Sequence, residues 1–425
     1  MMPTDPNAEA RAVATTTAGL RGTYWNPERL PKGVALTVHP LATADGSVVV
    51  GYLFRRGGET TVVSTMHPRE LVVPQYIVPE LLEGGCAVWL QGARSVGNDI
   101  RLEHESALLD LAAGQCFLTQ LGFKRRILLG ISGGAPLACF YTQQAALPGE
   151  SRLARSPAGK PTGLAEAEMP QPDGVVLLST HPGQGKLLLA AIDPAVVDEA
   201  DPLQSNESIS AFNPANGFKR PPESATYSEA FLADYRAAQL ERVQRIDAYA
   251  RAIVARRAEA RKRQKESPSR ATAIEAAFSP IFNVWRTDAD PRCFDLSLDP
   301  SDRAYGTLWG ANPFVSNYGS VGFARTCTAE SWLSNWSALS SNATMEKCAP
   351  DLRQPTLMVE YTGDNSVFPA DADQIYRSIG SPDKERYKVY GNHHGQPIRP
   401  NMPNGQFEAG KLIRDWLRRK DFSPF

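Results

Sequence analysis

Short apolar runs alternate along the chain with segments in which apolar residues recur every three or four positions. The first pattern predicts buried strands and the second predicts helices packed on one face. The predicted strands cover residues 33–40, 47–54, 60–66, 86–91, 126–131, 174–180, 355–361 and 385–390. The predicted helices cover residues 103–121, 133–146, 228–265 and 408–419. The first two strands flank a turn-rich ATADG segment and predict an antiparallel hairpin. The alternation as a whole predicts an α/β fold with a mostly parallel central sheet and helices on both faces.

Two long interruptions divide this alternation. Residues 148–172 are rich in Pro, Gly and Ala and predict a surface loop. A much longer interval, residues 193–349, separates two groups of sheet-like strands. We therefore expect a core in two parts, residues 34–192 and 350–425, with the interval between them as a large, mainly helical insertion. Residues 1–33 are polar and punctuated by Pro and Gly, and we expect them to form an N-terminal extension.

Charge and composition exclude several classes of partner. The 45 Lys and Arg residues balance 46 Asp and Glu residues, a net charge of −1 that argues against nucleic acid or an anionic membrane as a partner. The basic end of the predicted helix 228–265 is therefore expected to be a solvated helix terminus. No apolar run approaches the roughly 18 to 20 residues of a membrane span, and the first twenty residues lack the pattern of a secretory signal. Six scattered cysteines without a CxxC pair predict buried thiols in a cytoplasmic protein.

The clearest chemical feature is the sequence Gly-Ile-Ser-Gly-Gly at residues 130–134, directly between a predicted strand and a predicted helix. In a G-x-S-x-G turn the chain reverses so sharply that the central residue is strained and the flanking residues must be small. Ser132 is thereby expected above the sheet at a helix N-terminus. There the helix dipole and the Gly133 amide can stabilise negative charge on a bound carbonyl oxygen. The motif predicts a nucleophilic serine.

A serine hydroxyl needs a base that takes its proton and an acid that orients this base. Asp364 follows one late strand, and the adjacent residues His393 and His394 follow the next. The chain order serine, aspartate, histidine is the order expected for this architecture. We favour His394, in a G-x-x-H-G setting, as the base, with His393 as the alternative. Glu360, inside the strand before Asp364, is a weaker alternative acid.

These turns, GISGG, TGDNSVFP and GNHHG, resemble those of the α/β-hydrolase superfamily, over roughly residues 35–192 and 350–425. In that family a second oxyanion-hole amide comes from the loop after the third strand, which is here Thr-Met-His-Pro-Arg, ending at Arg69. Pro68 has no amide hydrogen to donate. The resemblance therefore implies that Arg69 or a neighbouring residue is the second donor beside Gly133.

The resemblance also implies that the segment 193–349 forms a cap over the active site. Aromatic residues are concentrated between residues 281 and 336. They predict an apolar roof for the pocket, although most of them are expected to form the core of the cap itself. Trp309 is taken from this group as a substrate-binding residue. His67 and His181 each follow a predicted strand, and both are expected to line the site.

The expected function is hydrolysis of a carboxylic ester with a hydrophobic or aromatic portion, through an acyl-enzyme on Ser132. Hydrolases of lactones, amides or C–C bonds and acyltransferases use the same three residues and stay open as alternatives, as does a non-catalytic binding protein on the same fold. No cofactor or metal is expected, because the sequence holds no HxH, HExxH, P-loop or GxGxxG motif. The sequence does not determine the oligomeric state; residues 148–172 and the cap are the contact surfaces expected if the chain forms a homo-oligomer.

Overall fold

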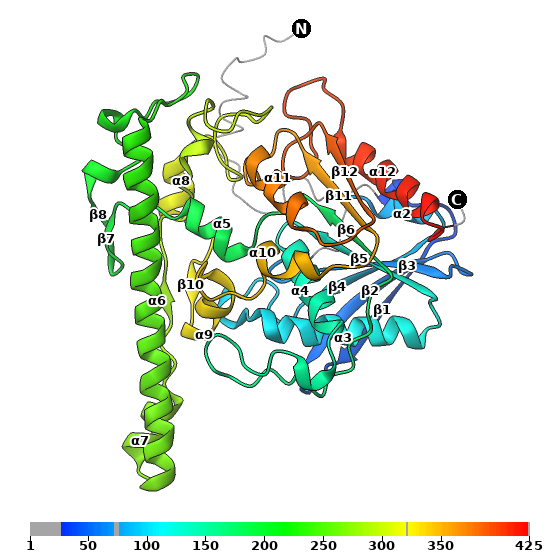
Figure 1. The fold of residues 1–425 in the computed structure, drawn as a ribbon, viewed down its shortest axis with the longest axis horizontal. Coiled ribbons are helices and arrows are strands. Elements are labelled where there is room, and N and C mark those ends of the chain that lie inside the picture. Colours follow the sequence, from blue (N-terminus) through cyan, green and yellow to red (C-terminus); the bar gives the residue numbers. More distant parts are fainter. Residues whose placement is uncertain (1–26, 72–75, 320–321, 424–425) are drawn as a thin grey trace.

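The computed structural model describes residues 27–71, 76–319 and 322–423, so most of the expected N-terminal extension, residues 1–33, lies outside the described residues. Its centre is an eight-stranded sheet in the order β1-β2-β4-β3-β5-β6-β11-β12 (Figure 1). The strands are β1 Ala35–Ala42, β2 Val48–Arg55, β3 Thr61–His67, β4 Ala87–Gly92, β5 Arg125–Ile131, β6 Gly174–Leu178, β11 Thr356–Tyr361 and β12 Lys384–Val389. Each of the eight predicted strands corresponds to one of these.

The pairing of the strands places the ends of all parallel strands at one edge of the sheet. Strand β2 pairs antiparallel with both β1 and β4, and all other neighbours are parallel. Strands β4, β6 and β11 are buried at every position, as expected of a sheet covered on both faces. The strand order and the helical cover are those of the α/β-hydrolase fold, so the predicted fold class is confirmed. Because the parallel strands end at one edge, the loops that follow them meet there.

Helices cover the two faces of the sheet with separate apolar clusters (Figure 1). Helices α3, α4, α10 and α11 pack on one face, and α2 and α12 pack on the other. Helix α5 follows β6, and α6 to α9 belong to the segment that precedes β11. The helices are α2 Val78–Glu83, α3 His104–Gln120, α4 Gly134–Ala145, α5 Gln184–Ala191, α6 Glu229–Glu266, α7 Arg270–Ala277, α8 Pro313–Tyr318, α9 Ala329–Ser331, α10 Met345–Cys348, α11 Pro369–Ser378 and α12 Gly405–Arg419.

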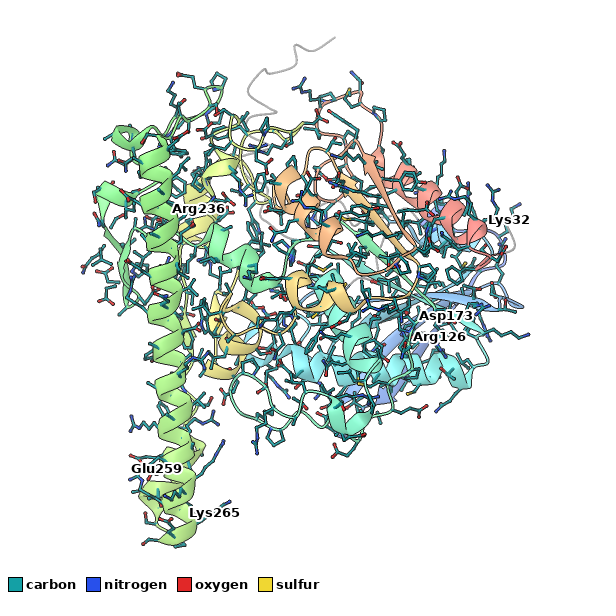
Figure 2. The ribbon with its side chains drawn as sticks, in the orientation of Figure 1. Lys32, Arg126, Asp173, Arg236, Glu259 and Lys265 are labelled. Atoms are coloured by element: carbon teal, nitrogen blue, oxygen red, sulfur yellow. The ribbon has the colours of Figure 1, made fainter. Side chains whose placement is uncertain are left out.

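Between β6 and β11 the chain leaves the sheet and forms a large, mainly helical insertion. Its longest element is α6, a helix of 38 residues whose N-cap Ser228 accepts a hydrogen bond from the amide of Phe231. The C-terminal part of α6 extends beyond the sheet with α7 against it, and it carries Glu259 and Lys265 (Figures 1 and 2). Two-stranded ribbons complete the insertion: β7 Val196–Asp198 with β8 Asp201–Ser205, and β9 Phe282–Asn283 with β10 Thr326–Cys327.

Intramolecular partners neutralise part of the basic end of α6. Arg256 and Arg263 form ion pairs with Glu275 of α7 at 3.5 and 2.5 Å, and Arg257 pairs with Glu330. Most aromatic residues of the insertion lie in its own two buried clusters, as predicted. In the described part of the chain, no helix is long and apolar enough to cross a membrane. All six cysteines are free thiols, and all but the half-buried Cys116 are buried.

Candidate active site

The turn between β5 and α4 places Ser132 at the carboxyl edge of the sheet. Ser132 has a φ of 50°, a backbone conformation that residues with a side chain rarely adopt. A Cβ atom at Gly130 would lie 2.3 Å from the Cα atom of Ala135, so the turn can close only with a glycine there. The strained serine and its small neighbours agree with the prediction made from the GISGG motif.

We expect Gly130→Ala to destabilise the fold by about 1–3 kcal/mol, because the new methyl group meets backbone that cannot move aside easily. Denaturant unfolding of the purified protein measures this free energy. Gly92→Ala is the matched control at the end of β4, where a Cβ would first meet the flexible Leu71 side chain, 3.3 Å away. Equal losses in the two variants would contradict the steric account of the turn.

Three loops at this edge bring together a serine, a histidine and an aspartate. His393 Nε2 lies 2.9 Å from Ser132 Oγ, and His393 Nδ1 lies 2.7 Å from Asp364 Oδ2. The other oxygen of Asp364 accepts the amides of Ser366 and Val367 at 2.7 and 3.0 Å. An ionised carboxylate only accepts hydrogen bonds, so His393 Nδ1 donates and Nε2 is free to accept the serine proton. The arrangement can activate the serine hydroxyl as a nucleophile.

The preference for His394 as the partner of Ser132 is wrong, because His393 takes this place. The ring of His394 packs edge-on against His393, with ring centroids 5.0 Å apart. Its amide donates to the side chain of Asn392 and its carbonyl accepts from Gln406, so His394 holds the loop in shape. Neighbouring residues of a turn point in different directions, and the G-x-x-H-G spacing alone could not tell them apart.

The contacts of two further residues, Ser179 after β6 and Glu360 in β11, define their roles. Ser179, directly after β6, donates its hydroxyl to the carbonyl of His393 at 2.8 Å and so fixes the loop that carries the histidine. Sequence reasoning missed this residue, because a single serine after a strand carries no signal. Glu360, the alternative acid, forms ion pairs with Arg386 and Lys388 at 2.7 and 3.3 Å. Asp364, not Glu360, therefore contacts the histidine.

The histidines of this edge differ in their protonation. Burial alone lowers the pKa of His393, but the charge of Asp364 and the hydrogen bond to it outweigh burial, so the pKa is raised above its ordinary value of 6.5. Burial lowers the pKa of His394 to about 3 and that of His67 to about 4. Burial also holds the pKa of His181 well below its ordinary value. At neutral pH these three rings are uncharged, whereas the raised pKa of His393 favours its charged form.

The backbone amide of Arg69, in the loop after β3, does not have the role expected for it. The Arg69 amide donates to Nδ1 of His67 at 3.1 Å, so it is not free to hold a substrate oxygen, and its expected role as the second oxyanion donor is corrected. The Arg69 guanidinium forms a two-point ion pair with Asp99, at 2.7 and 2.9 Å. It also lies over the ring of Trp336 in the insertion, 5.1 Å from the centroid. Arg69 thus ties the loop to the rest of the molecule.

His67 and His181 lie beside Ser132, where both were expected to line the site. A Cβ atom built on Gly133 would lie 2.8 Å from Nε2 of His67 and 3.3 Å from Nε2 of His181. The same point is 3.4 Å from the side-chain amide of Gln184, which contacts Nε2 of His104 at 3.0 Å. Neither Gln184 nor His104 was predicted, because each begins a helix and shows no pattern of its own. Five of the six histidines thus gather at this edge.

The insertion touches the site at two places. Trp309, expected to bind substrate, packs edge-on against Phe323 with centroids 4.5 Å apart, and Phe323 lies 5.9 Å from Trp336. This aromatic row ends at the ring over which Arg69 lies, so Trp309 is connected to the site through Phe323 and Trp336. At the second place the amide of Asp302 donates to the carbonyl of Thr362 at 3.0 Å. A cavity of about 250 Å³ lies there, lined in part by residues Ser301, Asp302, Ser179 and Asp364.

No group of three or more His, Cys, Asp or Glu side chains in the described ranges is arranged to hold a metal ion. The candidate chemistry described above uses side chains and backbone amides. Its parts come from the ends of β3, β5, β6, β11 and β12, all at one edge of the sheet. This is the place where open α/β sheets bind their ligands.

The sheet order and the serine turn define an α/β-hydrolase fold. No protein-family model matches the sequence, and a comparison with curated proteins also gives no match. Among solved structures the chain is similar to an esterase of Pyrococcus furiosus, at 12% identity and a TM-score of 0.41, over 93% of this chain and 94% of that chain. It is similar to a monoacylglycerol lipase of Paleococcus ferrophilus at 14% identity and a TM-score of 0.38, over 90% and 98%. It is similar to a thermophilic esterase of Thermogutta terrifontis at 13% identity and a TM-score of 0.40, over 90% and 98%.

Proposed function

We propose that this protein is a serine hydrolase that cleaves a carboxylic ester through an acyl-enzyme on Ser132. The observation that supports this most strongly is the hydrogen-bonded series from Ser132 through His393 to Asp364, with distances of 2.9 and 2.7 Å. A serine, a base and an orienting acid in this geometry are what acyl transfer requires. The strained position of Ser132 just before α4 meets a second requirement, because it holds a half-buried nucleophile beside a helix N-terminus.

The reaction follows from these positions. Ser132 Oγ attacks the ester carbon while its proton moves to His393 Nε2, and the π electrons of the carbonyl bond move to the carbonyl oxygen. The Gly133 amide, at the start of α4, donates to this oxyanion. When the carbonyl bond reforms, the alcohol leaves and takes the proton from His393. Water, deprotonated by His393, then attacks the acyl-enzyme in the same way and releases the carboxylic acid and Ser132. Asp364 stabilises the charged form of His393 in both halves.

The insertion supports a substrate with a hydrophobic or aromatic portion. We propose that it acts as a cap, because its row of Trp309, Phe323 and Trp336 ends beside the loop of His67 and Arg69. Aromatic side chains next to a few polar groups are typical of pockets for apolar small molecules. Trp309 is half-buried, whereas Trp336 at the other end of the row is buried, so Trp309 is the one proposed to contact the substrate.

An ester series tests the proposed function. We expect turnover of p-nitrophenyl esters with release of one carboxylic acid per p-nitrophenol, and loss of both in Ser132→Ala. Higher kcat/KM for longer or aromatic acyl groups than for acetate would support the apolar pocket, and a preference for acetate would count against it. Transfer of the acyl group to an added alcohol without acid release would assign the chain to the acyltransferases instead. Absence of any acyl release from esters, lactones, amides or diketones would refute the proposal.

The pH dependence follows from the raised pKa of His393. The neutral form of His393 is the base, so kcat/KM is expected to fall as the pH drops through a single ionisation with an apparent pKa above 6.5. In Asp364→Asn the charge that raises this pKa is lost and burial remains, so the apparent pKa should shift downward. The rate above that pKa should fall by about 10³–10⁴-fold, because the orienting acid is gone. Initial rates between pH 5 and 9 measure both effects. An unchanged apparent pKa in Asp364→Asn would contradict the role of the aspartate.

A further inference from the structure

The first three residues after β3, Pro68, Arg69 and Glu70, present no backbone amide to a substrate oxygen next to Ser132. Pro68 has no amide hydrogen. The amides of Arg69 and Glu70 both donate to Nδ1 of His67, each at 3.1 Å. All three residues after His67 are thus unable to supply the second oxyanion donor. With the Gly133 amide alone, the oxyanion would lack its second donor.

The same hydrogen bonds fix the tautomer of His67. A ring nitrogen that accepts two amide N–H groups carries no proton, so the proton of a neutral imidazole is on the other nitrogen, Nε2. Burial lowers the pKa of His67 to about 4, so the ring is neutral under ordinary conditions. His181 is held in the same way, because its Nδ1 accepts the amide of Gly183 at 3.2 Å and burial lowers its pKa. Both rings therefore carry an N–H group at Nε2.

These two N–H groups converge beside the serine. The Cβ position of Gly133 is 2.8 Å from Nε2 of His67 and 3.3 Å from Nε2 of His181. Within the described part of the chain, neither Nε2 atom makes a hydrogen bond to another protein group. The Gly133 amide precedes the first turn of α4 and is not used by the helix. Three N–H donors are therefore available beside Ser132: the Gly133 amide, Nε2–H of His67 and Nε2–H of His181.

We propose that the oxyanion hole is completed by imidazole N–H groups: Nε2–H of His67, assisted by Nε2–H of His181, donates with the Gly133 amide to the carbonyl oxygen attacked by Ser132. This inference rests on the proposed function. As Ser132 Oγ bonds to the carbonyl carbon and its proton passes to His393, the electron pair of the carbonyl bond moves to the oxygen and both imidazoles keep their protons. A neutral imidazole is suited to this role, because it polarises a carbonyl without repelling the His393 cation that forms in the same step.

His67 is consequently a donor and not a second base. Its Nε2 already carries the proton, and its Nδ1 is occupied by two amides. The resemblance leads one to expect an amide donor in this loop, and Pro68 has none. The amides of the two residues after Pro68 donate to the ring of His67, and in this proposal that ring donates to the substrate oxygen instead. Glycine at position 133 leaves the space that the two rings need, because a Cβ there would meet His67 Nε2 at 2.8 Å.

Kinetics of four variants test the inference. His67→Ala is expected to lower kcat for p-nitrophenyl esters by about 10²–10³-fold with KM changed by less than about threefold, since the oxyanion exists only in the transition state. His67→Gln is expected to recover activity to within about tenfold of the parent, because its amide N–H reaches the place of Nε2. His181→Ala is expected to lose about tenfold. His39→Ala is the matched control, since this histidine on β1 packs on Trp89 and Phe117 away from the site.

A parent-like kcat in His67→Ala, in a protein that hydrolyses esters through Ser132, would overturn the inference and leave the proposed function intact. Loss of activity in His67→Gln as large as in His67→Ala would also overturn it, because the glutamine retains the donor. Absence of ester hydrolysis in the parent protein would instead refute the proposed function. The two failures are therefore distinguishable.

A measurement on the unaltered chain makes the test independent of variant folding. In protein labelled with ¹⁵N-histidine, the inference expects Nε2 of His67 to carry a proton at pH 8. Addition of an aryl trifluoromethyl ketone, which forms a tetrahedral adduct with a reactive serine, should move this proton downfield as it binds the oxyanion. An Nδ1-protonated His67, or a His67 signal that does not move while the adduct forms, would contradict the inference.

Discussion

Replacing His393 with alanine is expected to lower kcat for ester hydrolysis by about 10⁴–10⁶-fold, whereas His394→Ala is expected to lower it by less than about tenfold. His393 bridges Ser132 and Asp364 through its two ring nitrogens, at 2.9 and 2.7 Å. His394 holds the loop through its backbone, and its side chain only packs against His393. Steady-state kinetics with p-nitrophenyl esters measure both losses.

The two variants control for each other. Each removes an imidazole from the same pair of packed rings, so each loses a similar packing contact, with centroids 5.0 Å apart. His393→Ala also loses the hydrogen bond to the buried Asp364, so thermal unfolding followed by circular dichroism should give it the lower midpoint, with both variants folded at the assay temperature. Only the catalytic loss should differ by orders of magnitude. Equal activities in the two variants, or a greater loss in His394→Ala, would contradict the assignment of His393 as the base.

Ser132→Ala is expected to abolish turnover, with a loss of about 10⁵–10⁶-fold in kcat, because the nucleophile that forms the acyl-enzyme is gone. Alanine also has a Cβ atom, so the strained turn with φ of 50° is retained and the fold should be unaffected. In rapid-mixing experiments the parent protein should release about one equivalent of p-nitrophenol in a burst whenever deacylation is the slower step. The variant should show no burst.

Ser179→Ala is the matched control for this substitution. Ser179 has the same φ of 50° and also follows a strand at the same edge, but its hydroxyl donates to the carbonyl of His393 and is turned to no reacting atom. We expect a loss of about tenfold, from a less well-fixed histidine loop. A Ser132→Ala protein that keeps the burst, or one no less active than Ser179→Ala, would contradict the nucleophile assignment.

The alternation of strands and helices could be predicted well from the sequence because it depends on local patterns. The apolar runs of β4, β6 and β11 are buried at every position, and short runs of this kind are typical of the central strands of a covered sheet. The long helix α6 begins after Ser228, a residue type that commonly caps helices. The ribbon of β7 and β8 could not be predicted, because Asp201–Ser205 is polar and largely exposed and its pairing depends on the rest of the insertion.

The candidate site could be predicted only in part, because a local turn leaves a pattern in the sequence and a contact between distant residues does not. The G-x-S-x-G spacing describes a local turn, so it located Ser132. The choice between His393 and His394 depends on how the loop is held by Ser179, more than 200 residues earlier in the chain, and no spacing contains this information. The direction of the Arg69 amide depends on the ring of His67. Such side-chain to backbone hydrogen bonds decide the site but leave no periodic pattern.

Mass spectrometry of the intact protein after exposure to a fluorophosphonate tests the central claim most directly. The reagent bonds to a serine only when a neighbouring base activates it, and it needs no knowledge of the natural substrate. The proposed function predicts one adduct per chain, located on the peptide that contains Ser132 and absent from Ser132→Ala. A chain that forms no adduct, or an adduct that persists in Ser132→Ala, would contradict the claim that Ser132 is an activated nucleophile.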